Sequence, residues 1–334
     1  MIGNRFTKTF KWLLGAVGLL LALGFVIGLI AAWVYRDVPA STVEARWATE
    51  SSQFIEIDGV RLHFRDEGEG PTVVLLHANY SSLFMWEPWA KALRDNYRVV
   101  RVDLPAHGLT GPEPLGNYTL ERIQYLVEAF IDARGLDRFT LVGTSIGGTV
   151  AMRYAADHPS RLERLVLISP GSLEQRVRGR TRGADIPKAA NVIAYVAPPA
   201  FTRFMLENDY GDPAKVTDAV VDEWYSMWSR EGNRLAMIEL LRQYVSGGVE
   251  EKIRSVQVPV LLIWGEKNKR VPLKLAYETR DLLTNAPEVR LEVLPGIGHM
   301  LVQEAPFESA AVVRRYLDEF KEKGAIRTSA PVSP

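Results

Sequence analysis

The chain has 334 residues, a length that allows one large α/β domain with an insertion or two ordinary domains, and its 47% hydrophobic and 24% charged residues are typical of a globular protein. The 40 Lys and Arg residues balance the 40 Asp and Glu residues, so the overall charge gives no indication of a nucleic-acid partner. The absence of cysteine excludes disulfides, zinc–thiolate sites and thiol catalysis.

The first predicted element is a transmembrane anchor helix at residues 12–35, which contain no charged residue. As a helix this segment would extend roughly 36 Å at ~1.5 Å per residue, enough to cross a hydrocarbon core of ~30 Å. The alternative is a cleaved signal peptide, although the apolar stretch exceeds the ~7–15 residues usual there and no A-x-A site ends it. Arg5, Lys8 and Lys11 precede the helix. This excess of basic residues on the N-terminal side of the helix predicts that residues 1–11 are cytoplasmic. The residues after the helix would then lie outside the inner membrane.

Two further features adjoin the anchor. Gly24 and Gly28 form a GxxxG pattern, which indicates a face through which the helix could self-associate. Residues 36–52 are mostly polar and predict a linker that leads away from the membrane. We therefore expect the lipid bilayer to be a partner of residues 12–35 and the folded domain to begin at residue 53.

From residue 53 onwards, buried strands alternate with amphipathic helices. A hairpin comes first, with Asp58-Gly59 as its tight turn. Short runs rich in Val, Leu and Ile then predict strands at 72–76, 97–102, 139–143, 164–169, 258–264 and 289–294. Helical patterns fall mainly between them, at 83–94, 119–134, 147–158, 272–284 and 304–321. This alternation predicts an α/β fold with a mainly parallel, doubly wound sheet of about eight strands.

The domain organisation follows from one long gap between strands. About 88 residues separate the fourth of these six runs from the fifth, too many for a simple crossover. We expect a helical cap there, at residues 171–256, between core segments 53–170 and 257–321, and a disordered tail at 322–334. The cap begins with a basic stretch and carries aromatic and Met residues, most of which would form its own core. The two groups include Arg176, Arg178, Arg180 and Arg182, and Phe201, Phe204, Met205, Trp224 and Trp228.

A serine in a glycine-rich turn is the first candidate for chemistry. Ser145 stands in the order Gly143-Thr144-Ser145-Ile146-Gly147, directly after a predicted strand and before a predicted helix. Small neighbours leave room for a strained turn that presents a nucleophile, and the N–H groups at the start of the helix favour developing negative charge. The alternative is a glycine-rich turn that merely contains a serine.

A serine nucleophile needs a base, and the chain has five histidines. His63, in the hairpin, and His158, at a helix end, are interpreted as structural. His299 lies in a glycine-rich loop after the last predicted strand, from which an imidazole could reach Ser145; the alternative is a surface histidine. No histidine pair has metal-ligand spacing and cysteine is absent, so we expect neither a metal nor another cofactor.

Four segments resemble motifs of the α/β-hydrolase family in the family's order, and the resemblance covers roughly residues 53–320. They are LLHANYSSLFMW at 75–86, DLPAHGLTG at 103–111, GTSIGG at 143–148 and GIGHMLVQEAP at 296–306. The place of the cap insertion agrees as well. The membrane segment followed by FIEIDGVRLHFRDEG is similar to a bacterial subgroup of these hydrolases.

The resemblance implies a role for each matching residue of the reaction centre. Ser145 would attack a carbonyl carbon, and His299 would take its proton and later donate it to the leaving group. The backbone N–H groups of Asn79 and Ile146 would hold the oxyanion that forms during this attack.

The same motifs imply supporting residues around that centre. His77 would brace the oxyanion loop, in which Ala78 stands where the family usually has glycine. Asp103 would anchor the turn after its strand, and His107 would share that structural role.

The chain departs from the family at the residue that orients the histidine. After the strand at 258–264 the family has Gly-x-x-Asp-x-x-x-Pro, whereas this chain reads GEKNKRVP, with Asn268 in place of the aspartate. An asparagine can hold an imidazole but carries no charge to stabilise imidazolium. Three alternatives stay open: another acid such as Glu266 or Glu174 serves instead, the site works slowly as Ser-His-Asn, or hydrolysis has been lost and the protein binds a ligand.

The expected function is a membrane-anchored serine hydrolase that cleaves an ester, thioester, lactone or C–C bond through an acyl-enzyme. Ser145 at the elbow argues against haloalkane dehalogenases and epoxide hydrolases, whose nucleophile is aspartate. The aromatic and Met residues of the cap, with the membrane anchor, favour an apolar small-molecule substrate. Two rivals are a tethered ligand-binding protein on a hydrolase fold, suggested by Asn268, and an assembly role of the membrane helix through Gly24 and Gly28.

Overall fold

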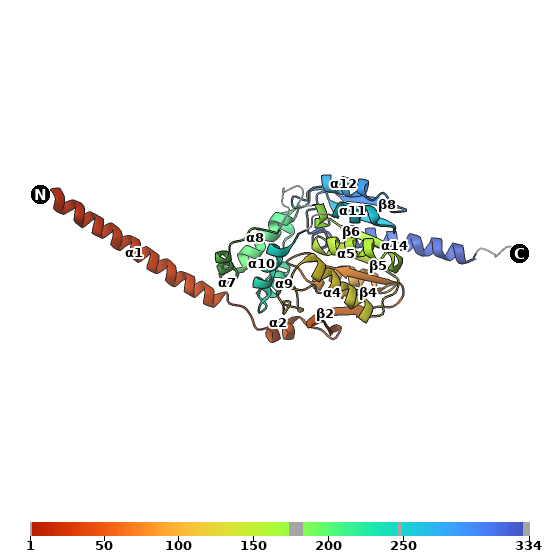
Figure 1. Cartoon of the computed structure of the whole chain (residues 1–334), viewed down its shortest axis with the longest axis horizontal. Helices are drawn as coiled ribbons and strands as arrows, with labels where there is room; N and C mark the ends of the chain where they lie inside the picture. The colour runs from red at the N-terminus through yellow and green to blue at the C-terminus, as the bar shows by residue number, and fades with distance from the viewer. Residues whose placement is uncertain (1, 174–182, 246–248, 330–334) are drawn as a thin grey trace.

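Eight strands form one sheet in a computed structural model that describes residues 2–173, 183–245 and 249–329 (Figure 1). Their order across the sheet is β1-β2-β4-β3-β5-β6-β7-β8. The pairs β1–β2 and β2–β4 are antiparallel, and the other neighbours are parallel. The strands are β1 (Ser52–Ile57), β2 (Val60–Glu67), β3 (Thr72–Leu76), β4 (Arg98–Val102), β5 (Phe139–Thr144), β6 (Leu162–Ile168), β7 (Val260–Gly265) and β8 (Val289–Leu294). The predicted mainly parallel sheet is confirmed.

Helices cover both faces of this sheet, because successive residues of its strands point to opposite sides and both sides are apolar. Leu141 of β5 joins a buried cluster with α4, α5, α11 and α12, whereas the next residue, Val142, joins a second cluster with α3 and α14. These helices are α3 (Glu87–Leu93), α4 (Leu120–Ala133), α5 (Ile146–Asp157), α11 (Val249–Ser255), α12 (Lys274–Leu282) and α14 (Pro306–Ser329). The predicted doubly wound arrangement is therefore confirmed.

Between β6 and β7 the chain forms the helices of the cap. They are α7 (Val192–Val196), α8 (Pro199–Asp209), α9 (Asp218–Ser229) and α10 (Asn233–Gln243), and they lie together at one end of the sheet (Figure 1). Helix α11 falls within the predicted cap but contacts α5 and α12 of the core instead. Glu174 and the four arginines from Arg176 to Arg182 lie outside the described residues.

Short helices complete the connections around the sheet and the cap. They are the 3-10 helices η1 (Leu83–Trp86), η2 (Pro159–Arg161), η3 (Gly171–Leu173), η4 (Lys188–Asn191) and η5 (Pro213–Lys215), and helix α13 (Leu301–Glu304).

Residues 36–52, predicted to be a polar linker, instead contain helix α2 (Ala40–Trp47), which packs on the domain. Its Val43 is 3% exposed and lies in a small apolar cluster with Phe84 of the core and Met227 of the cap. A helix with one buried side chain shows no repeated spacing of apolar residues in the sequence. The hydrophobic pattern of residues 36–52 therefore did not indicate this packing.

The N-terminal helix α1 (Ile2–Val34) extends away from the domain (Figure 1). Its segment Phe10–Val34 is long and apolar enough to cross a membrane. A Cβ atom built at Gly24 or Gly28 would meet no atom within 4 Å. Self-association through these glycines therefore stays a prediction.

The C-terminal helix continues further than the sequence indicated. Helix α14 runs to Ser329, although disorder was predicted from residue 322. The Lys, Glu and Ala residues in this region are good helix formers, so the helix extends past the end of its apolar pattern. Residues 330–334 lie outside the described residues.

Candidate active site

Ser145 lies at a strained turn between β5 and α5. Its backbone has φ 52° and ψ −115°, and non-glycine residues rarely adopt such a positive φ. The turn is also crowded: a Cβ atom built at Gly143 would lie 2.2 Å from the carbonyl oxygen of Gly147, and one built at Gly147 would lie 2.4 Å from that of Leu76. Glycine at both positions therefore allows the strand to turn directly into the helix and hold Ser145 at the edge of the sheet.

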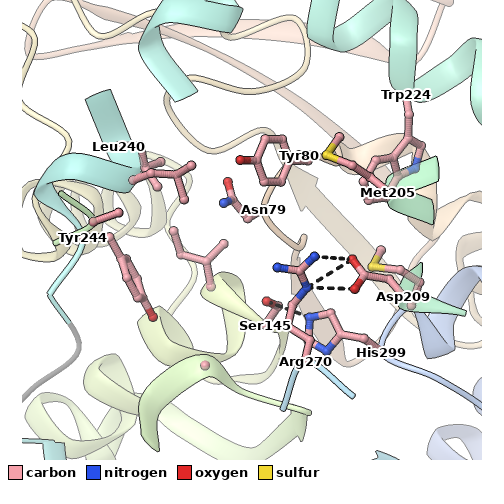
Figure 2. Close-up of a pocket in the computed structure, with 15 residues that line it drawn as sticks. Asn79, Tyr80, Ser145, Met205, Asp209, Trp224, Leu240, Tyr244, Arg270 and His299 are labelled. Atoms are coloured by element: carbon pink, nitrogen blue, oxygen red, sulfur yellow. Dashed lines mark hydrogen bonds and ion pairs between the residues drawn. The ribbon is translucent and has the colours of Figure 1, made fainter. Parts of the chain in front are cut away.

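The carboxyl ends of the parallel strands bring Ser145 and His299 together, since Ser145 follows β5 and His299 follows β8. The Ser145 Oγ lies 3.1 Å from the His299 Nε2 (Figure 2). The two residues are 8% and 3% exposed. A serine hydroxyl thus has an imidazole nitrogen within hydrogen-bond reach in a largely buried site.

Asn268 follows β7 and contacts the other side of the imidazole. Its Nδ2 lies 3.1 Å from the His299 Nδ1 and donates to the Ser169 Oγ at 3.0 Å. Its Oδ1 accepts the backbone N–H of Val271 at 2.8 Å. Reversing the amide would set two donors against each other at Val271, so the N–H of that residue fixes the orientation of the amide.

This orientation determines where His299 holds its proton. An amide NH2 group can only donate, so the His299 Nδ1 must accept, and the proton of the neutral ring then lies on Nε2. The Nε2–H donates to the Ser145 Oγ, whereas a general base needs a free lone pair at that nitrogen. An aspartate at position 268 would accept from an Nδ1–H and favour the opposite tautomer.

His299 has a weakly basic ring. Burial, and after it the positive charge of Arg270, lower the pKa of His299 to about 3. Arg270 itself is paired with Asp209 at 2.7 Å (Figure 2). The imidazole is therefore neutral at neutral pH.

Of the two alternative acids, Glu174 lies outside the described residues, and the carboxylate of Glu266 contacts a backbone group of the loop before His299. Glu266 is exposed, and its Oε2 accepts the backbone N–H of Gly296 at 2.8 Å. This contact stabilises the loop before His299 and leaves Asn268 as the residue at the His299 Nδ1.

The loop after β3 brings Asn79 to the same cavity as Ser145 and Ile146. His77 is buried, with its Nδ1 2.7 Å from the carbonyl oxygen of Ala78 and its Nε2 accepting a backbone N–H from the next strand's loop at 2.9 Å. Ala78 is not among the described residues with positive φ. Its methyl group is therefore tolerated where glycine is usual.

Asp103 is buried below this loop. Its carboxylate accepts the backbone N–H groups of Leu83 at 2.7 Å and Leu109 at 2.9 Å, and it lies 2.7 Å from the His63 Nδ1. Burial raises the pKa of Asp103, but the hydrogen bonds and neighbouring charges outweigh it and hold the pKa at about 2. His107 adds a contact of 2.9 Å to the Asn79 side chain. These groups fix the turns that support the loop.

A cavity of about 270 Å³ adjoins Ser145 and His299 (Figure 2). The cap supplies much of its wall through Met205 of α8, Trp224 of α9 and Leu240 of α10. The site therefore lies between the edge of the sheet and the cap, and its wall is largely apolar on the cap side.

Phe201, Phe204 and Trp228 of the cap are not among the residues that line this cavity. Phe201 and Phe204 are 37% and 62% exposed. Trp228 packs against Tyr80, with the ring centroids 5.5 Å apart. Of the five apolar cap residues that the sequence analysis connected with substrate, only Met205 and Trp224 line the cavity.

A family model of the alpha/beta hydrolase fold matches residues 71–306. The chain belongs to this family. The match covers most of both core segments and the whole predicted cap, and it includes the serine elbow and the histidine loop.

One curated relative and two solved structures are similar to this chain. The hydrolase is 27% identical over 271 residues to a monoacylglycerol lipase of Xenopus laevis, and the alignment covers 76% of this chain and 77% of that one. A bacterial membrane phospholipase A superposes with a TM-score of 0.66 at 23% identity, covering 93% of this chain and 99% of that one. An enol-lactonase from Burkholderia xenovorans superposes with a TM-score of 0.66 at 20% identity, covering 80% and 100%. The two solved structures establish the shared fold.

The hydrolase also contains a buried carboxylate that the sequence analysis did not identify. Glu304 accepts the backbone N–H groups of Gly298 at 2.7 Å, Gly211 at 2.9 Å and Asp212 at 2.8 Å. It thereby joins the histidine loop to the chain directly after cap helix α8. The only signal in the sequence was a lone charged residue in the stretch 300–306.

Proposed function

We propose that this chain is a membrane-anchored serine hydrolase that forms an acyl-enzyme on Ser145 and cleaves an ester, a thioester or a lactone, with C–C cleavage as the second reaction class. The observation that carries the proposal is the 3.1 Å approach of the Ser145 Oγ to the His299 Nε2 at a strained strand–helix turn. A serine held this way beside an imidazole is suited to nucleophilic attack on a carbonyl group.

The reaction proceeds in two halves. The Ser145 Oγ bonds to the carbonyl carbon while its proton passes to the His299 Nε2, and the backbone N–H groups of Asn79 and Ile146 hold the resulting oxyanion. Collapse of this intermediate breaks the bond to the leaving group, which takes the proton from His299. Water then attacks the acyl-enzyme in the same manner and releases the acid and free Ser145.

Asn268 makes the first proton transfer slow. His299 can accept the serine proton only as the Nδ1–H tautomer. In this tautomer the Nδ1–H faces the NH2 group of Asn268, so two donors meet. If the amide reverses, its NH2 group faces the N–H of Val271 instead. An unmade hydrogen bond of this kind costs about 1–3 kcal/mol, and no aspartate offsets the charge of the imidazolium. In a serine protease, asparagine in place of the triad aspartate lowered kcat by about 10⁴. We therefore propose slow turnover.

The second candidate function is a hydrolase-fold protein that binds a ligand without cleaving it. The observation in its favour is the Asn268 Nδ2 placed 3.1 Å from the His299 Nδ1, where hydrolysis needs an acceptor. In this case the cavity beside Ser145 would serve as the binding site.

The proposed substrate is an apolar small molecule. Met205, Trp224 and Leu240 on the cap side of the cavity support this class. The anchor at residues 12–35 would tether the enzyme to the inner membrane, and the basic residues before it favour a cytoplasmic N-terminus. The catalytic domain would then act on the outer, periplasmic side.

The test treats the full chain in detergent with a fluorophosphonate probe and with p-nitrophenyl esters of increasing acyl length. Labelling and hydrolysis should both fall by at least about 10³-fold in Ser145→Ala. Ser229→Ala, which removes a buried hydroxyl in the cap, should keep both. Glu266→Gln should also keep both, because this carboxylate contacts Gly296 rather than His299.

Other outcomes would redirect the proposal. A parent chain that neither labels nor hydrolyses, beside an Asn268→Asp variant that does both, would support the ligand-binding alternative. Hydrolysis restricted to short, polar esters would contradict the apolar substrate.

A further inference from the structure

The end of the membrane helix packs against the cap. Helix α1 contacts α7 (Figure 1). Two residues of the last turn of α1, Ala31 and Ala32, are half-buried, and so is Tyr35 directly after the helix. In contrast, Trp33 and Val34 are 67% and 52% exposed. One face of the last turn of α1 therefore lies against α7.

Buried Arg234 fixes this junction. Its Nη1 donates to the backbone oxygens of Tyr35 and, at 2.6 Å, of Ala194 in α7. Its Nε lies 3.6 Å from the Asp37 Oδ1. Val38 adds two backbone hydrogen bonds of 2.8 Å to the turn between α9 and α10. The anchor and the cap are thus joined by partly buried polar contacts on both sides of residue 36.

The junction places α7 at the level of the bilayer surface. The apolar span is Phe10–Val34, and Ala31 lies inside it, about 4.5 Å from its end at ~1.5 Å per residue. A helix that packs against Ala31 and Ala32 lies beside the last turn of the spanning segment rather than above it.

Up to Phe204, the exposed side chains of α7 and α8 are apolar, whereas Asn208 further along α8 is exposed and polar. Between Lys188 and Arg203 the chain has no charged residue. The Arg203 guanidinium donates to the carbonyl oxygen of Val216 at 3.1 Å and pairs with Asp218. The exposed side chains of this surface, here called the cap patch, are Val192, Tyr195, Phe201 and Phe204, which are 60%, 40%, 37% and 62% exposed.

We propose that the cap patch is embedded in the outer interfacial layer of the lipid bilayer and forms a second membrane contact beside α1. This inference rests on the anchoring part of the proposed function. Aromatic side chains favour the membrane–water interface, and an amphipathic surface there buries its apolar face ~5–10 Å deep. The partner is lipid rather than a second copy of the chain, because the patch is continuous with a helix whose own apolar surface requires lipid.

Helix α8 connects the cap patch with the cavity. Phe201 and Phe204 belong to the patch, and Met205, the next residue, lines the cavity with Ser145. An apolar substrate dissolved in the bilayer would therefore reach Ser145 along α8 without passing through bulk water.

The experiment uses the absence of native cysteine, since one introduced cysteine then carries one dye. Tyr195→Cys and Phe204→Cys in the full chain are labelled with the environment-sensitive dye NBD and reconstituted into phosphatidylcholine vesicles, with and without doxyl-labelled lipid. Tyr277→Cys is the matched control, because Tyr277 is 43% exposed, close to the 40% of Tyr195, and lies on α12 far from α1 (Figure 1). Leu21→Cys reports on the anchor itself.

We expect blue-shifted emission that rises severalfold on reconstitution, with quenching by doxyl lipid, at Tyr195, Phe204 and Leu21 but not at Tyr277. Quenching at Leu21 alone would overturn the inference and leave the anchor intact. No quenching at any position would overturn both. Blue-shifted emission at the cap positions that doxyl lipid does not quench, and that grows with protein density, would indicate contact between copies of the chain and overturn the lipid assignment. Fluorophosphonate labelling of the same samples reports on Ser145 separately, so failure of the proposed chemistry stays distinguishable.

Discussion

The two nitrogens of the His299 ring lie in surroundings that suit hydrolysis unequally. At Nε2, the strained elbow holds the Ser145 Oγ at 3.1 Å. At Nδ1, the Asn268 Nδ2 lies at the same distance of 3.1 Å, but it donates where an aspartate would accept. The position of the imidazole and the nitrogen that carries its proton are therefore set separately in this site. An amide holds the ring in the same place as an aspartate would, but it favours the opposite tautomer.

The largest effect on this comparison is expected from Asn268→Asp. A carboxylate at this position would accept both the Val271 N–H and an Nδ1–H from His299, which frees Nε2 to act as a base. We expect kcat on p-nitrophenyl esters to rise by about 10²–10⁴. Asn208→Asp is the matched control, because the Asn208 amide donates to the carbonyl oxygen of Phe204 in its own helix, at 2.8 Å. An unchanged kcat in Asn268→Asp would show that the tautomer of His299 does not limit the reaction.

A smaller effect is expected at the clamp that holds the histidine loop. In Glu304→Gln an NH2 group would face one of the three backbone donors, so the free energy of unfolding should fall by about 1.5–3 kcal/mol. We also expect kcat to fall by about tenfold, since a small misplacement of His299 weakens its approach to Ser145. Thermal unfolding and ester hydrolysis measure the two effects.

The control for this change is Glu308→Gln, which alters an exposed carboxylate in the first turn of α14. If both variants unfold at the same temperature, Glu304 does not hold the loop.

The pH dependence sharpens the comparison further. A base acts only when neutral, and the pKa of His299 is about 3, so the parent enzyme should keep its activity down to about pH 4. In Asn268→Asp the new carboxylate favours the imidazolium and raises the pKa of His299. Its activity should therefore be lost at a higher pH as the solution is acidified. Profiles of kcat/KM against pH for both chains test this, and coincident acid limbs would contradict it.

The smallest effect is expected from Ser169→Ala. This change removes one acceptor from the Asn268 Nδ2 but leaves the Val271 N–H, which fixes the amide. We expect kcat to change by less than about fivefold. A rise comparable to that of Asn268→Asp would instead assign control of the amide to Ser169.

The sequence predicted that the site residues follow strands of the sheet, but it did not predict which groups donate and which accept in their hydrogen bonds. Ser145, Asn268 and His299 each follow a predicted strand, and parallel strands bring their carboxyl ends to one edge. The direction of the Asn268 amide depends on the Val271 N–H. Every residue except proline carries such a donor, so no pattern marks the one that matters.

Packing of the segment after the anchor escaped prediction for a related reason. Val43 of α2 contacts Phe84 and Met227, which lie far from it in the chain. Local periodicity carries no information about partners of this kind, whereas the alternation of strands and helices in the core could be read directly.

In the proposed membrane-bound state, the hydrogen bonds of Val38 and Arg234 would keep a fixed distance between the lipid and Ser145. Surface charges attract a domain to a membrane with a strength that falls as ionic strength rises. Here the height of Ser145 above the acyl chains would be set by partly buried hydrogen bonds instead. On this proposal, the height of Ser145 above the bilayer should be the same in dilute buffer and in concentrated salt.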